Sequence, residues 1–142
     1  MPAGACYALE RMRKPAVVAL LVAATLQAHH SFSAEFDPEK QVTFQGVVTK
    51  IEWTNPHIYF YADVKDPKGK QDTWVFETAG PNTLVRLGWS RNSLKVGDRV
   101  TVIAFPARDG AKVASAREVV LANGKKVFSG SPNDGGPAAK WE

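Results

Sequence analysis

Apolar and polar residues alternate with a period of two through much of the chain between residues 41 and 128. The clearest stretch runs from Ile58 to Val64, where every second residue is apolar. Successive side chains of a β-strand point to opposite faces of a sheet, so this period is typical of strands that bury one face and expose the other. Because the chain of 142 residues has the length of one domain, we predict a single, mainly β domain.

The first predicted strand, residues 41–53, changes phase partway along. Phe44 falls on one face, whereas Val47 and Ile51 fall on the other, and Gly46 stands at the switch. A glycine at a change of phase is typical of a bulge or a sharp bend. We therefore expect this strand to bend at Gly46 and to serve two sheets of a closed barrel.

The remaining segments predict the order of the strands. After residues 58–64 and a hairpin turn at 65–70, we expect strands at 72–78, 100–104 and 113–121 and a short sixth strand ending near residue 128. Pro81 and Gly88 bracket a short apolar segment, and these residues suit the two ends of a helix. Three strands, a short helix and further strands is the order of an OB-like β-barrel. We predict a small, mainly all-β, OB-like barrel of five to six strands with one short helix between strands 3 and 4. A generic six-stranded barrel or sandwich is the alternative.

The N-terminal segment has the three parts of a secretory signal peptide. Three basic residues between positions 11 and 14 precede an apolar run of eleven residues at 16–26, and Ala28 places a small residue at the cleavage position. The run is shorter than the roughly 20 residues that span a bilayer, so we expect no permanent membrane span. We therefore predict a cleaved signal peptide at residues 1–28 and a periplasmic or secreted protein.

Cleavage of this signal defines the predicted mature chain. It leaves the barrel domain at residues 29–128 and a Gly- and Pro-rich tail at 129–142, which we expect to be disordered. Cys6, the only cysteine, is removed, so no disulfide or thiol chemistry is expected. Three basic residues and one acidic residue are removed as well, which lowers the net charge from +4 to +2. So small a charge argues against nucleic acid as a partner.

Motifs of the common enzyme classes are missing from the sequence. There is no Gly-x-Ser-x-Gly elbow, no paired carboxylate motif, no phosphate-binding Gly-rich loop and, in the predicted mature chain, no cysteine nucleophile. We therefore predict a binding protein rather than an enzyme. Redox chemistry at a bound copper ion is the one catalytic route that remains open.

Three histidines carry the strongest chemical signal. His29 and His30 begin the predicted mature chain, and His57 stands where the second strand begins. A free N-terminal histidine binds a metal through its α-amino and ring nitrogens together, and a histidine brought near by the fold adds a third nitrogen. This arrangement, a histidine brace, suits Cu(II), which heads the affinity order of the divalent metals. We predict a Cu(II) carrier or sensor that uses His29 and His57, with His30 as an auxiliary or substitute ligand.

The copper prediction depends on where the signal is cleaved. Cleavage after Gln27 would place a histidine third in the chain, which is a different Cu(II) or Ni(II) site that uses backbone nitrogens. Cleavage after Ala24 would leave four residues ahead of an ordinary histidine cluster. A structural alternative also stands, in which His29 and His30 form a flexible polar lead and His57 caps a turn or bonds a strand-edge carbonyl.

Other side chains have supporting or alternative roles. Glu52 and Asp63 are candidates to orient a ligand histidine by accepting a hydrogen bond from its second ring nitrogen. Trp53, Tyr59 and Tyr61 are candidates for an exposed aromatic face, of the kind with which small barrels bind ligands. The alternative function is thus a non-metal ligand-binding or adaptor module, with another periplasmic protein as a candidate partner.

Four motifs give the chain a resemblance to known sequences. They are Ala28-His29-His30-Ser31-Phe32, Glu52-Trp53-Thr54-Asn55-Pro56-His57, Gly88-Trp89 and Leu94-Lys95-Val96-Gly97-Asp98. Together they resemble a family of small exported bacterial proteins of unknown function, over residues 28–128. The resemblance implies an exported β-rich domain and supplies no activity and no ligand. The copper prediction therefore rests on residue chemistry alone.

Overall fold

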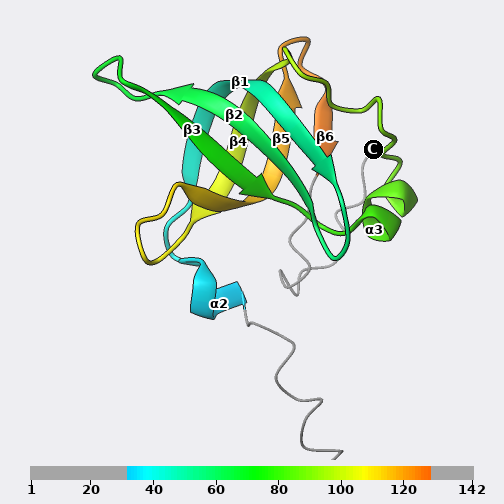
Figure 1. The fold of residues 1–142 in the computed structure, drawn as a ribbon, viewed down its shortest axis with the longest axis horizontal. Coiled ribbons are helices and arrows are strands. Elements are labelled where there is room, and N and C mark those ends of the chain that lie inside the picture. Colours follow the sequence, from blue (N-terminus) through cyan, green and yellow to red (C-terminus); the bar gives the residue numbers. More distant parts are fainter. Residues whose placement is uncertain (1–31, 129–142) are drawn as a thin grey trace, which may run out of the picture. The chain divides into compact units, whose positions relative to one another are not determined.

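A computed structural model describes residues 32–128, in which six strands form one sheet that curls into a barrel (Figure 1). The elements in chain order are α2 (Phe32–Glu35), β1 (Val42–Trp53), β2 (Ile58–Lys65), β3 (Gln71–Glu77), α3 (Pro81–Arg86), β4 (Arg99–Pro106), β5 (Val113–Leu121) and β6 (Lys126–Phe128). Neither helix in this part of the chain has the length and apolar composition of a membrane span. The predicted signal peptide at 1–28 and the predicted tail at 129–142 lie outside the described residues.

The strand order explains how the barrel closes. The strands follow the order β3-β2-β1-β4-β5-β6, and neighbours in this order are antiparallel. A further, parallel pairing between β3 and β5 closes the first five strands and leaves β6 as an extra strand beside β5. α3 lies in the connection between β3 and β4, where the sequence predicted a helix. The prediction of a mainly β, OB-like barrel with a short helix at this point is confirmed.

β1 is the longest strand, and its two halves pair with different neighbours. Its first half pairs with β4 and its second half with β2, and both pairings include Gly46 and Val47. The predicted change of phase occurs, but it falls between Val48 and Lys50, where the register with β2 shifts, rather than at Gly46. Val48 is therefore buried, whereas Val47 is 40% exposed on the outer face. The bulge then returns Ile51 to the core side, where it packs against the buried cluster.

Gly46 is required for a different reason, which is the close approach of β2. A Cβ at this position would lie 2.7 Å from the carbonyl oxygen of Asp63. Because that oxygen belongs to the backbone of the sheet, we expect Gly46→Ala to destabilise the domain by about 1–3 kcal/mol. Urea unfolding measures the loss. Val47→Ala, at the neighbouring exposed position, is the control, and a Gly46→Ala protein as stable as this control would contradict the account.

The core fills the barrel with inward-facing side chains from all five barrel strands. Phe60 and Phe76 are fully buried and stack with 5.0 Å between their ring centroids. Phe44 meets Phe76 edge to face at 5.3 Å. Leu84 of α3 is also fully buried and joins this cluster. Gly88, with a φ of +89°, follows the end of α3 as predicted, because glycine adopts this conformation without strain.

The segment that opens the described chain is anchored to the loop between β4 and β5 (Figure 1). The ring of Phe32 in α2 meets the ring of Phe105 edge to face at 5.5 Å. Arg108 in the loop donates a hydrogen bond through Nε to the carbonyl oxygen of Ser33 at 2.9 Å. Its backbone N–H donates to the carbonyl oxygen of Glu35, also at 2.9 Å. The sequence pattern predicted no element here, because the anchor joins residues more than 70 positions apart.

Candidate functional site

His57 lies in the turn between β1 and β2, and its imidazole is held in one orientation. Nδ1 lies 2.9 Å from the carbonyl oxygen of Thr78, the residue that follows β3. A carbonyl oxygen can only accept a hydrogen bond, so Nδ1 carries the hydrogen and Nε2 is the unprotonated nitrogen of the neutral ring. The side chain is 24% exposed, and Nε2 has no hydrogen-bond partner among the described residues. His57 therefore has one ring nitrogen available as a lone-pair donor.

Glu77 and Tyr59 surround this imidazole, and the three residues are called the His57 cluster below. Glu77 lies opposite Tyr59 in the β2–β3 pairing, and its Oε1 is 3.5 Å from Nδ1 of His57. The rings of His57 and Tyr59 meet edge to face with 6.3 Å between their centroids. Burial is the main cause that raises the pKa of Glu77 and the pKa of Tyr59 above their ordinary values. The negative charge of Glu35 on α2 adds to both shifts, so the anchored segment contributes to the electrostatics of the cluster.

The raised pKa of Glu77 predicts a pH-dependent stability. Burial penalises the charged carboxylate in the folded domain, so ionisation favours the unfolded chain. The penalty is absent while the carboxyl group is protonated in both states, and it develops as the pH rises above 4.5. We therefore expect Glu77→Gln to unfold at a higher temperature than the natural protein at pH 7, with the difference shrinking toward zero at pH 4. Thermal unfolding with a metal chelator present measures this, and a larger gain at pH 4 than at pH 7 would contradict it.

The described residues contain part of the predicted metal site. Within residues 32–128, no group of three or more His, Cys, Asp and Glu side chains is arranged to hold a metal ion. His57 stands in this part of the chain with one carboxylate beside it, that of Glu77. His29 and His30 lie outside the described residues. The copper site therefore stays a prediction.

Glu52 and Asp63, the carboxylates that the sequence suggested as orienting groups, have other partners. Glu52 forms an ion pair with Lys50 and accepts a hydrogen bond from the Tyr61 hydroxyl at 3.2 Å. Asp63 accepts hydrogen bonds from two side chains of β3, at 2.6 and 3.0 Å. Neither carboxylate contacts His57. The groups that hold its ring lie instead at the end of β3.

Those groups, Glu77 and Thr78, were not among the candidate residues predicted from the sequence. Both follow His57 by 20 residues or more, so no local motif joins them. The available signal was the hairpin turn at 65–70, because the length of a hairpin loop fixes the register of the strands on either side. Pairing outward from that turn places Glu77 opposite Tyr59. A carboxylate next to His57 could have been found in this way.

The three rings of the predicted aromatic face have different surroundings. Tyr59 and Tyr61 alternate with buried residues of β2 and share its outer face, as expected. Nζ of Lys50 lies 4.9 Å from the ring centroid of Tyr61, and the guanidinium of Arg91 lies 5.4 Å from that of Trp53. Such cation contacts contribute about 0.5–1 kcal/mol at exposed sites. Side chains of the same domain thus occupy positions over two of the three rings.

Comparison with known proteins gives one match. A family model with the description Family of unknown function (DUF6152) matches residues 16–116, which is more than half of the chain. No curated protein and no solved structure matches.

Proposed function

The chain belongs to the family of unknown function DUF6152, and we propose from its residues that it is a periplasmic metal-binding protein that holds Cu(II) through an N-terminal histidine brace. Its role is that of a carrier or sensor rather than an enzyme. The family carries no assigned activity, so the support for this proposal comes from the chemistry of the residues.

One observation carries the proposal, which is the way the imidazole of His57 is held. Histidines that bind metals commonly donate their second ring N–H to a backbone carbonyl or a carboxylate, which fixes the tautomer and the direction of the ring. His57 has both kinds of partner at Nδ1, the carbonyl oxygen of Thr78 at 2.9 Å and the carboxylate of Glu77 at 3.5 Å. A ring oriented in advance has less rotational freedom to lose when Nε2 binds an ion.

The remaining nitrogens come from the predicted mature N-terminus. They are the α-amine and the ring of His29, with His30 as an auxiliary or substitute ligand. Two residues after His30, the sequence enters the segment that Arg108 anchors. Glu35 in that segment acts electrostatically on Tyr59 and Glu77. Because this segment is already anchored to the domain, less chain entropy is lost when His29 and His30 become ordered around a metal ion, which supports the proposal.

The donor set favours Cu(II) over other divalent ions. Two imidazoles and an amine are all-nitrogen ligands, and Cu(II) binds such ligands most strongly among the divalent first-row metals. The carboxylates of Glu77 and Glu35 add negative charge that attracts a cation. Hard cations such as Mg²⁺ and Ca²⁺ prefer oxygen ligands and are the weaker fit.

The test begins with the intact mass of the protein exported by its host, which identifies the first residue of the mature chain. Cu(II) is then titrated in the presence of a competing chelator of known affinity. We expect a chain that begins at His29 and binds one Cu(II). The same protein with its N-terminal amine acetylated is the matched control, and we expect it to bind roughly a hundredfold more weakly, a difference of about 2.8 kcal/mol.

Two results would overturn the proposal. One is weak binding without a defined stoichiometry, and the other is equal affinity in the free and acetylated chains. Either result would favour the alternative function, a non-metal binding or adaptor module on the outer face that carries Tyr59 and Tyr61. Replacing both tyrosines would then be expected to abolish binding of the partner, while the histidines could be lost without effect.

A further inference from the structure

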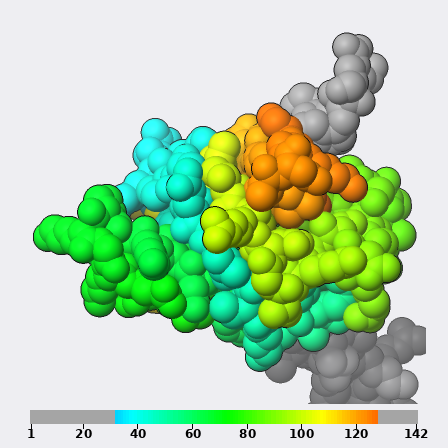
Figure 2. Space-filling view, turned by 90° about the horizontal axis from the view of Figure 1, so that it is seen from above, coloured from blue at the N-terminus to red at the C-terminus, as the bar shows by residue number. Residues whose placement is uncertain are grey.

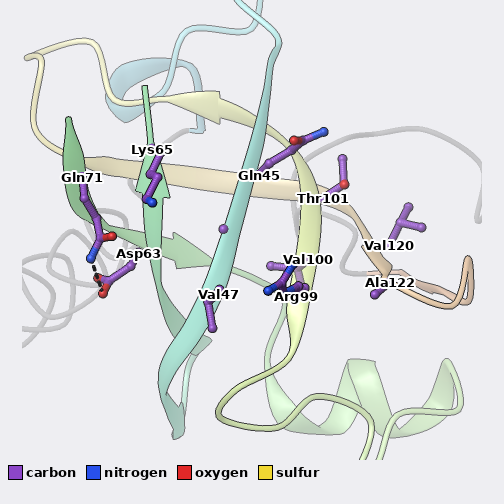
Figure 3. A pocket seen from close by; sticks show the side chains of 11 residues that line it. Gln45, Val47, Asp63, Lys65, Gln71, Arg99, Val100, Thr101, Val120 and Ala122 are labelled. Atoms are coloured by element: carbon purple, nitrogen blue, oxygen red, sulfur yellow. Dashed lines mark hydrogen bonds between the residues drawn. The ribbon is translucent and has the colours of Figure 1, made fainter. Parts of the chain in front are cut away.

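A groove with a volume of about 710 Å³ crosses the outer face of the barrel and shares no residue with the His57 cluster. Its lining comes from strands β1 to β5 (Figure 3). In the space-filling view, the β2–β3 hairpin in green and the β5–β6 region in orange stand on either side of the surface of β1 and β4 (Figure 2). We propose that this groove binds an acidic segment of a partner polypeptide. The proposal is independent of copper binding.

The strand register arranges the side chains of the groove in rows across β1. In one row, Val47 lies between Asp63 of β2 and Arg99 of β4. In the next row, Gln45 lies beside Thr101 of β4. Gly46 and Val47 pair with β2 on one side and β4 on the other, so the backbone of β1 is already engaged here. The groove therefore recognises a ligand through its side chains.

The charges of the groove favour an anion. Asp63, the one acidic residue that lines it, accepts a hydrogen bond from the side chain of Gln71 (Figure 3) and another from that of Thr73. Lys65 and Arg99 are exposed and have no ion-pair partner among the described residues. They stand on strands that flank β1, one on each side. The charged side chains that line the groove, Lys65, Arg99 and Asp63, therefore carry a net charge of +1, which favours an anionic ligand.

The remaining lining residues favour a peptide among possible anions. Lys65 and Arg99 belong to strands two apart, which is about 10 Å across a sheet, so an extended ligand that crosses β1 can meet both. The amide of Gln45 and the hydroxyl of Thr101 suit the N–H and C=O groups of a peptide, and the exposed Val47 offers an apolar contact. Bases of single-stranded nucleic acids are held by stacking on aromatic rings, and none of the residues lining this groove is aromatic.

The test uses an acetylated, amidated hexaglutamate peptide as the probe and the natural protein. Binding is followed by the chemical shifts of the backbone amides in nuclear magnetic resonance spectra. We expect the shifts to concentrate at residues 45–47, Lys65 and Arg99, and the affinity to fall as salt is added, because screening weakens exposed charges. Hexaglutamine and hexalysine, the neutral and charge-reversed peptides, are expected not to bind.

Matched variants locate the charges that matter. Lys65→Gln and Arg99→Gln are each expected to weaken hexaglutamate binding about two- to fivefold, the size expected for an exposed ion pair of up to about 1 kcal/mol. The double variant is expected to weaken binding by roughly the product of the two factors. Arg117→Gln, on β5 and outside the groove, is the control and is expected to bind as the natural protein does. Equal weakening by the control, shifts elsewhere on the domain, or binding of an acidic oligosaccharide without hexaglutamate binding would overturn the proposal.

Discussion

Replacing His57 with alanine is expected to weaken Cu(II) binding by at least about tenfold, which corresponds to about 1.4 kcal/mol or more. The variant removes the imidazole of His57, the one histidine among residues 32–128, and with it a part-buried hydrogen bond to the carbonyl oxygen of the buried Thr78. Competition titration with a chelator measures the affinity. Circular dichroism of the apo protein verifies that the barrel is folded.

Asp63→Asn is the matched control for this experiment. Asp63 is a carboxylate that the sequence suggested as an orienting group, but its hydrogen bonds go to Gln71 and Thr73 rather than to His57. We therefore expect Asp63→Asn to bind Cu(II) as the natural protein does. Equal affinity in the His57→Ala protein, or equal losses in both variants, would remove His57 from the site and with it the brace.

The second large effect is expected in the core, where Phe76→Ala should lower the unfolding free energy by about 3–5 kcal/mol. Phe76 is fully buried, stacks on Phe60 and meets Phe44 edge to face. It also lies opposite Ala114 in the parallel β3–β5 pairing that closes the barrel. The cavity left by the missing ring would therefore lie beside the β3–β5 pairing that closes the barrel.

Urea unfolding followed by fluorescence measures this loss. Val85→Ala is the control, because this residue of α3 is 57% exposed and a surface change of this kind stays within about 0.5 kcal/mol. If Phe76→Ala lowered the unfolding free energy no more than Val85→Ala does, the packing of Phe76 beside the β3–β5 pairing would not contribute to the stability of the core.

Much of the fold could be predicted from the sequence because its signals are local. The alternation from Ile58 to Val64, the hairpin turn that follows it, and the Pro81 and Gly88 that bracket α3 each act within a few residues. The position of the bulge in β1 could not be predicted in this way. It depends on β1 pairing with β4 and then with β2, and the exposed Val47 carries the same apolar signal as a core residue.

The candidate sites show the same division. His57 could be identified from its residue type and its place at the start of a strand, whereas its partners Glu77 and Thr78 depend on the register of the hairpin. The groove is harder to predict from the sequence, because Lys65 and Arg99 come from strands that both pair with β1 and do not pair with each other. Lys65 and Arg99 share no sequence motif, and only the pairing of the strands places them on either side of β1.

An electron paramagnetic resonance spectrum of a one-to-one Cu(II) complex of the exported, processed protein distinguishes a histidine brace from other copper sites. We expect coupling to three nitrogen donors, the α-amine and two imidazoles. We expect this signal to disappear when the N-terminal amine is acetylated, and the coupling of one imidazole to be missing in the His57→Ala variant. A spectrum that is the same in the free and acetylated chains, or one with only oxygen donors, would contradict the claim that this family member holds copper by a histidine brace.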